Sequence, residues 1–205
     1  MAAAIVPAGS SQVPFPERLR RQAHFSSCGR FRYALRRLWN PALPQCTFIG
    51  LNPSRADAWV DDPTVRRCIG FARHWGFGSL LLLNLFALRA TDPRALRQVD
   101  DPVGPRNDRW LRAAARETPA IVAVWGDGGR YRGRADRVRS WLGPLLCLGE
   151  TRNGQPRHPL YLSADTPLRA LTPAGVSLRR RHVHDADGRR GARFSPPRRY
   201  DADGA

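Results

Sequence analysis

The sequence predicts an α/β fold in which a central, mostly parallel sheet lies between two layers of helices. Apolar segments typical of buried strands recur along the chain, at 46–51, 80–83, 121–125 and 145–148. Segments with helical spacing of apolar residues alternate with them, at 62–75, 107–117 and 134–142. Such alternation is typical of parallel strands joined by helical crossovers, with helices on both faces of the sheet. We therefore expect a three-layer sandwich.

A single domain is expected over residues 16–171. The chain of 205 residues is long enough for one substantial core. Residues 1–15 show little periodicity and lack the features of a signal peptide. Residues 172–205 are rich in Arg, Asp, Gly and Pro. We expect both ends to be disordered, the second as a basic tail.

The first strand of the sheet is expected over 31–39, where apolar residues alternate with Arg and Ala. This pattern is typical of a strand with one solvent-exposed face, so we place the strand at the sheet edge. The second strand, 46–51, is apolar and ends in the stiff turn Asn52-Pro53-Ser54. Pro53 restrains its own backbone and that of Asn52, so the Asn52 side chain has a defined direction.

The first helix is expected to follow Asp62, which precedes a proline and suits the N-cap position. The third strand, 80–83, is apolar without alternation, as expected for a central strand covered on both faces, and ends at Asn84. Short helices are expected over 92–99 and 166–171.

The net charge is +17, and all 34 basic residues are Arg. A strongly basic surface favours polyanions, and Arg binds phosphate through two parallel hydrogen bonds. An Arg-biased genome would produce the same composition, so charge alone does not establish nucleic-acid binding. The absence of Lys excludes a lysine Schiff base and a P-loop lysine.

Four cysteines, Cys28, Cys46, Cys68 and Cys147, are widely separated and form no Cys-x-x-Cys pair. We expect free thiols in a cytoplasmic protein and no zinc site. No apolar run approaches the roughly 18 residues of a membrane span, so no membrane association is expected.

Polar groups follow the strands at the carboxyl ends, where open α/β sheets bind ligands. They are Asn52-Pro53-Ser54, Asn84, Trp125-Gly126 and, on a later loop, His158-Pro159. Gly50, two residues before Asn52, allows another group to approach the backbone closely.

These motifs, in this order, resemble those of the uracil-DNA glycosylase superfamily. Gly50-Leu51-Asn52-Pro53 is similar to its Gly-x-(Asn or Asp)-Pro motif, and Asn84 to an Asn that some members place after a Leu-rich strand. Trp125-Gly126 is similar to a Trp-Gly pair at the end of a later strand. His158-Pro159-Leu160 occupies the place of a His-Pro-Ser motif, with Leu160 in place of Ser.

A closer resemblance, from about residue 31 to residue 162, is to an uncharacterised bacterial family of unknown function. Its signatures are Gly-Leu-Asn-Pro-Ser, Asp-Asp-Pro-Thr-Val-Arg-Arg-Cys, Asn-Leu-Phe-Ala-Leu-Arg-Ala-Thr-Asp-Pro and Arg-His-Pro-Leu-Tyr-Leu.

The glycosylase resemblance implies a monofunctional hydrolase of N-glycosidic bonds that acts as a monomer on a base in nucleic acid, DNA being favoured over RNA. It implies catalytic roles for Asn52, which would orient a water, and His158, which would donate to the departing base. Asn84 would read a pyrimidine edge, and Phe86 or Trp125 would stack on the base. The candidate substrate-binding residues are Gly50, Pro53, Ser54, Asn84, Phe86, Trp125 and Arg157.

Two alternative functions stay open: a hydrolase of free nucleosides or nucleotides, and a non-catalytic nucleic-acid-binding protein. Structural roles also stay open for three of the residues, because Asn84 could cap a turn, His158 could bond a backbone carbonyl and Trp125 could lie in the core. Asp57, Asp61 and Asp62 cluster in sequence, but helix capping accounts for Asp62. We therefore expect no metal or other cofactor.

Overall fold

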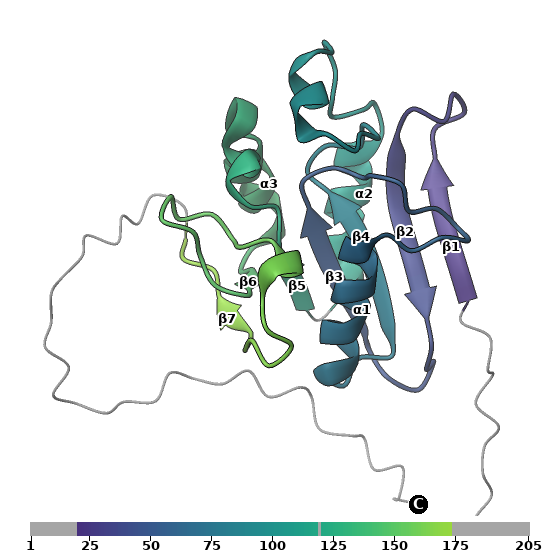
Figure 1. Ribbon diagram of the computed structural model, residues 1–205, viewed down its shortest axis with the longest axis vertical. Helices are drawn as coiled ribbons and strands as arrows, with labels where there is room; N and C mark the ends of the chain where they lie inside the picture. The colour runs from purple at the N-terminus through teal and green to yellow at the C-terminus, as the bar shows by residue number, and fades with distance from the viewer. Residues whose placement is uncertain (1–19, 119, 174–205) are drawn as a thin grey trace, which may run out of the picture.

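A seven-stranded mixed sheet forms the centre of the computed structural model, which describes residues 20–118 and 120–173 (Figure 1). The strand order is β1-β2-β4-β3-β5-β6-β7. Neighbours among β4, β3, β5 and β6 pair in parallel, whereas β1, β2 and β7 join through antiparallel pairs. The strands are β1 (Arg20–Phe25), β2 (Arg32–Leu38), β3 (Gln45–Gly50), β4 (Ser79–Asn84), β5 (Ala120–Ala123), β6 (Leu146–Cys147) and β7 (Arg169–Ala170).

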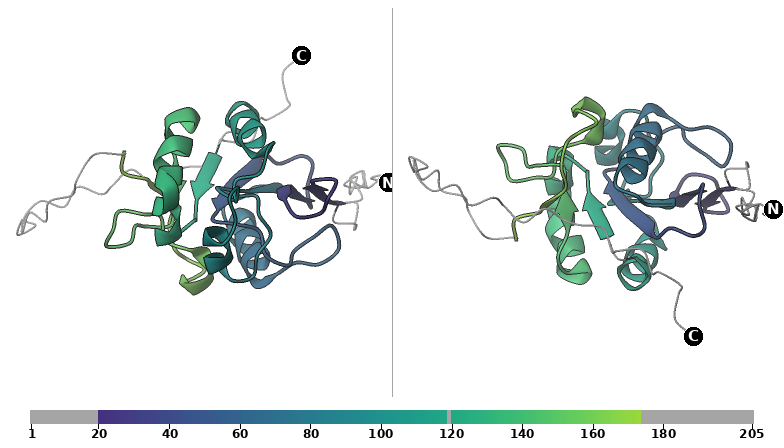
Figure 2. Two further views of the ribbon diagram at one scale, coloured as in Figure 1. Left: turned by 90° about the horizontal axis from the view of Figure 1, so that it is seen from above. Right: turned by 90° about the horizontal axis from the view of Figure 1, so that it is seen from below.

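Helices cover both faces of this sheet, as Figure 2 shows from above and below. Helix α1 packs with one apolar cluster on one face, and α2 and α3 pack with a second cluster on the other. The α/β class and the parallel centre of the sheet therefore agree with the expectation. The helices are α1 (Pro63–His74), α2 (Asn107–Glu117) and α3 (Arg134–Leu142), with short 3-10 helices η1 (Pro93–Arg97), η2 (Asp127–Gly133) and η3 (Pro159–Tyr161).

Helix α1 begins as its sequence predicts, because the Asp62 carboxylate accepts a hydrogen bond from the Val65 backbone N–H. Its buried face consists of Val65, Cys68, Phe71 and Ala72. The capping bond and this apolar face together set where the helix starts and how it lies against β4.

Strand β2 differs from the expectation, since it lies inside the sheet and has no solvent-exposed face. Strand β1 pairs with its outer side, and Arg32 and Arg37 are buried at 1% and 0% exposure. Arg37 is buried because Asp61 and the Asp57 carbonyl accept hydrogen bonds from its guanidinium. Arg32, one of the residues that suggested a wet face, therefore belongs to the interior, and Arg36 is partly buried.

The segment 166–171 contains no helix, in contrast to the expectation. Arg169 and Ala170 instead pair with β6 as the short strand β7. Leu168 and Leu171, on either side of this pair, are buried against the body of the domain. Contacts across the sheet thus override the weak local preference of this segment.

The expectations of disorder for residues 1–15 and for the tail beyond residue 173 lie outside the described residues. Thr172 lies inside them, and both its backbone N–H and its hydroxyl donate to the Glu150 carboxylate. All four cysteines are free thiols, as expected. In the part of the chain that the structure describes, every helix is too short or too polar to cross a membrane.

Candidate functional site

A cavity of about 230 Å³ lies beyond the carboxyl ends of β3 and β4, beside the start of α1. Gly50 and Asn84 are register partners at the ends of these two parallel strands, so their side-chain positions meet at one edge. Six of the nine predicted site residues line the cavity: Gly50, Asn52, Ser54, Asn84, Trp125 and His158. Its other lining residues are Arg32, Leu51, Asp62, Thr64, Leu82, Ala90, Thr91 and Pro93.

The Asn84 amide lies directly over Gly50. A Cβ atom at Gly50 would come within 2.9 Å of Asn84 Oδ1, which only the absence of a side chain permits. Asn84 is 3% exposed, and its Nδ2 donor has no hydrogen-bond partner among the described residues. Asn107 fixes the backbone here by donating to the Asn84 and Leu85 carbonyls at 3.0 Å. The cavity wall therefore contains a buried amide whose Nδ2 donor has no partner among the described residues.

The Asn52 side chain is fixed through its amide nitrogen. Nδ2 donates to the carbonyl oxygens of Pro53 at 3.1 Å and Ala90 at 2.8 Å. The Ala90 backbone N–H donates in turn to the Pro53 carbonyl. With both donors of the amide used, Asn52 offers its Oδ1 acceptor to a ligand or a water.

His158 is held as the N-cap of η3, where its Nδ1 accepts from the Leu160 backbone N–H. An Nδ1 acceptor places the proton of the neutral ring on Nε2. Burial lowers the pKa of His158 below its ordinary 6.5, and the negative charge of Asp62 opposes this shift. At neutral pH, His158 is therefore a neutral donor through Nε2.

Trp125 forms a rigid part of the cavity wall. The residue is buried, and its indole N–H donates to Gln155 Oε1 at 3.0 Å. A side chain on Gly129 would collide with the indole ring. Trp125 is thus a core residue that also lines the cavity, and its stacking role stays a prediction.

Arg32 is the most unusual side chain at the cavity, and the sequence pattern placed it in solvent. Its Nη1 donates to the Ala56 carbonyl at 2.8 Å, but its buried Nε has no partner in the described part of the chain. No described carboxylate lies within 4.0 Å of the guanidinium. Burial lowers the pKa of Arg32 to about 10, with the charge of Asp62 opposing the shift. The group is therefore a buried cation at neutral pH.

Asp62 is the one carboxylate among the cavity-lining residues. Its Oδ1 caps α1 through Val65, which accounted for the residue at the level of sequence. The cap uses only this oxygen of the carboxylate, and the side chain also acts electrostatically on His158 and Arg32. Asp62 thus lines the cavity as well as capping α1, whereas sequence reasoning assigned it only the capping role.

The segment of the chain that forms this cavity matches the model of one protein family. The family model described as "Protein of unknown function (DUF1643)" matches residues 32–160. The chain belongs to the DUF1643 family. This confirms the expected membership in a family of unknown function. No curated protein and no solved structure matches the chain significantly.

The DUF1643 match begins at Arg32 and includes His158, so it contains every residue that lines the cavity. The match gives no reaction for the family. The side chains of the cavity are therefore the guide to its chemistry.

Three predicted residues lie inside the DUF1643 match but do not line the cavity. Phe86 is fully buried in the core cluster beneath α2 and α3, 5.7 Å from the Tyr131 ring, so it has no free face for a base. Pro53 is buried and contributes its carbonyl to the Ala90 contact. Arg157 is exposed on the loop before His158. The stacking role expected of Phe86 therefore does not fit its position.

The acidic residues near the DUF1643 cavity have partners in the protein. Asp57 accepts from the Trp59 and Val60 backbone N–H groups, and Asp61 pairs with Arg37. Within residues 20–118 and 120–173, no group of three or more His, Cys, Asp or Glu could hold a metal ion. The donors of the cavity suit an organic ligand with acceptor atoms.

Proposed function

We propose that the chain hydrolyses an N-glycosidic bond in nucleic acid, with the base of the target nucleotide bound in the cavity. The observation that carries this proposal is the pair of buried donors, Asn84 Nδ2 and Arg32 Nε, which both lack partners among the described residues. Leaving a buried donor unsatisfied costs about 1–3 kcal/mol. Such donors in a cavity wall indicate a ligand with matching acceptors.

The size and polarity of the cavity favour a single base. Its volume of about 230 Å³ is below the range of roughly 300–1,000 Å³ typical of pockets for drug-sized ligands. The exocyclic carbonyl oxygens of a uracil-like base are suitable acceptors for Asn84 and Arg32. The resemblance of the four motifs to the uracil-DNA glycosylase superfamily supports the same assignment.

Four residues of the cavity have a chemical role in the proposed reaction. Water attacks the anomeric carbon, the carbon–nitrogen bond breaks, and its electron pair leaves with the base. The charge of Arg32 and the Nε2–H of His158 stabilise the developing anion on the base. Asn52 orients the water through Oδ1. Asp62 accepts the proton that the water loses, because an amide cannot act as a general base.

Base release from defined substrates tests this proposal. Purified protein is incubated with single- and double-stranded oligonucleotides that contain uracil, hypoxanthine, xanthine or a mismatch, and alkali then cleaves any abasic site. We expect strand cleavage that disappears in Asn52→Ala and His158→Ala. The matched controls are Asn153→Ala and His74→Ala, at exposed positions outside the cavity.

The other outcomes separate the alternatives. Release of base from free deoxyuridine or its monophosphate, without release from oligonucleotides, would replace the nucleic-acid substrate by a free one. Oligonucleotide binding without release from any substrate would instead indicate a non-catalytic binding protein.

A further inference from the structure

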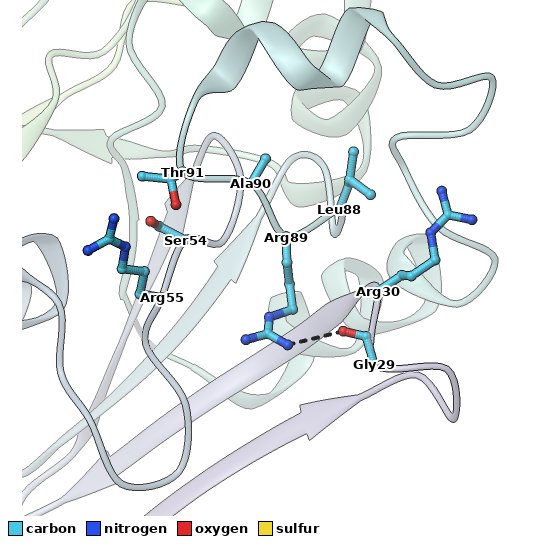
Figure 3. Close-up of a pocket in the computed structure, with 8 residues that line it drawn as sticks. All are labelled: Gly29, Arg30, Ser54, Arg55, Leu88, Arg89, Ala90 and Thr91. Atoms are coloured by element: carbon cyan, nitrogen blue, oxygen red, sulfur yellow. Dashed lines mark hydrogen bonds between the residues drawn. The ribbon is translucent and has the colours of Figure 1, made fainter.

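An open groove of about 490 Å³ lies beside the cavity and shares part of its wall (Figure 3). Ser54, Ala90 and Thr91 line both spaces. The remaining residues of the groove are Gly29, Arg30, Arg55, Leu88 and Arg89. A ligand that enters the cavity can therefore extend into the groove across this shared wall.

Three arginines give the groove a strongly positive charge. Arg55 and Arg30 stand on opposite sides of it, with Arg89 between them (Figure 3). All three are exposed, and none has a carboxylate within 4.0 Å in the part of the chain that is described. The groove contains no acidic residue among those that the structure describes. Its positive charge is therefore available to an anion.

Contacts within the protein fix the position of one of these arginines. Arg89 donates from Nη1 to the Gly29 carbonyl at 3.2 Å, and its guanidinium lies 4.9 Å from the centre of the Phe25 ring. These contacts leave further N–H donors of Arg89 free. The hydroxyl groups of Ser54 and Thr91 add two donors on the shared wall.

We propose that this groove binds a phosphate group of the ligand whose base occupies the cavity. The inference rests on the proposed function for the nature of the group in the cavity. Arginine matches phosphate because its planar fork donates two parallel hydrogen bonds to two oxygens. The phosphate belongs to a flanking phosphodiester of a strand or to the nucleotide itself, and the two sources are separable by experiment.

The test is DNA binding by a groove variant and a charge-matched control. The groove variant is R30Q/R55Q/R89Q, and the control is R109Q/R116Q/R137Q, in which three exposed arginines of α2 and α3 are replaced with the same change of charge. The probe is a fluorescein-labelled single-stranded DNA about 15 nucleotides long with one uracil, measured by anisotropy. Unchanged unfolding midpoints establish that both variants are folded.

We expect the groove variant to bind about tenfold or more weakly, and the control to stay within about twofold of the unmodified protein. The slope of log K against log salt should fall by ~0.7 for each phosphate of a single strand that the variant no longer neutralises. Equal weakening in the two variants would overturn the proposal. So would the absence of any binding by the unmodified protein.

Competition by deoxyuridine and its 5′-monophosphate identifies the source of the phosphate. A stronger effect of the monophosphate, abolished in the groove variant, assigns the site to the phosphate of the nucleotide itself. If the groove variant weakens binding of the oligonucleotide but not of the monophosphate, the groove binds a flanking phosphodiester.

The groove and the reaction can fail separately. If the groove variant and the control release base with the same kcat/KM, phosphate binding in the groove is contradicted, but the proposed hydrolysis is not. If DNA binding depends on the groove but no base is released, the proposed hydrolysis is contradicted, but phosphate binding in the groove is not.

Discussion

The close approach of the Asn84 side chain to Gly50 shows how one residue shapes the cavity. The Asn84 amide occupies the volume that a side chain at Gly50 would need. The absence of a side chain at Gly50, at the end of β3, therefore makes room for the Asn84 amide at the end of β4.

Gly50→Ala tests this close approach. The added methyl group would displace the Asn84 amide, so we expect loss of base release and a destabilisation of about 1–3 kcal/mol. The control is Gly70→Ala in α1, where a Cβ atom meets nothing within 4 Å. This second change should stabilise the protein by about 0.5–1 kcal/mol, because alanine favours a helix. Full activity in Gly50→Ala would contradict the position of Asn84 in the site.

Asp62 combines helix capping with a proposed role as general base, and substitution by Asn separates the two. Asn and Asp cap helices about equally well, so Asp62→Asn should keep the cap and lose only the attraction between the Asp62 charge and the buried Arg32 cation. Base release should fall by about 10²–10⁴-fold, because the amide cannot accept the proton from water. The matched control is Asp92→Asn, which changes the N-cap of η1 outside the cavity. Equal activity in both variants would exclude Asp62 as the base.

We expect His158 to make the stability of the protein and the proposed base release depend on pH in the same direction. Burial lowers its pKa in the folded state, so the unfolded chain takes up a proton first as the pH falls below 6.5. The stabilisation from neutral His158 is therefore complete above 6.5 and is lost as the pH falls through the lowered pKa.

We expect kcat/KM for base release to decline on the acid side below pH 6.5, since a protonated ring loses its Nδ1 acceptor. Parallel measurements of the unfolding midpoint and of kcat/KM between about pH 5 and 8 provide the check. The stability change over this range should be smaller in His158→Gln. An identical pH dependence of stability in that variant would show that another group titrates.

At the scale of elements, loops that cross between strands shape both the cavity and the groove. The loop from Asn52 to Asp61 connects β3 to α1 and lies over β2. Its inner side is tied to that strand by Arg32, which donates to Ala56, and by Arg37, which pairs with Asp61 at 2.7 Å. Two buried arginines of one strand thus hold the loop that carries Ser54 and Arg55.

Asp61→Asn is expected to release this loop. The change leaves Arg37 fully buried without its carboxylate, and breaking a buried pair in this way costs about 3–5 kcal/mol. Thermal unfolding should therefore shift down by roughly 6–20 °C for a domain of this size. Asp165→Asn, at an exposed position, should leave the midpoint almost unchanged. A shift of similar size in both variants would contradict the role of the Arg37 pair.

At the scale of the whole molecule, the sequence predicts the parallel centre of the fold and most of the cavity. Strands β3, β4 and β5 are apolar runs that must be buried, and polar residues follow their ends. In a parallel sheet these ends lie at one edge, which brings Asn52, Asn84 and Trp125 together.

Features that depend on distant contacts were not predictable in the same way. Strands β1 and β7 are polar or very short, and only pairing with their neighbours makes them strands. Arg32 lies in an alternating pattern that suits solvent exposure, but its partner Ala56 is 24 residues away. Phe86 has an aromatic ring that could stack on a base, but the local sequence does not show that this ring packs into the core.

Truncation after Pro173 tests the extent of the folded domain. Residues 174–205 are rich in Arg, Asp, Gly and Pro and contain few core-forming residues, so their removal should leave the unfolding midpoint unchanged. DNA affinity should fall, because the removed segment is rich in Arg. Thermal melts and DNA titrations of the two chains provide the check. A lower midpoint in the truncated chain would show that the domain extends beyond residue 173.

The wall between the cavity and the groove has a consequence for selectivity. Hydrogen bonds from Asn52 Nδ2 to the Ala90 carbonyl and from the Ala90 N–H to the Pro53 carbonyl lock its two loops together. Because these hydrogen bonds hold the wall in one position, the distance between the cavity and the groove is fixed for any molecule that occupies both. Ligands whose two ends are separated by a different number of bonds would satisfy one side only, and recognition would then depend on length as strictly as on chemical identity.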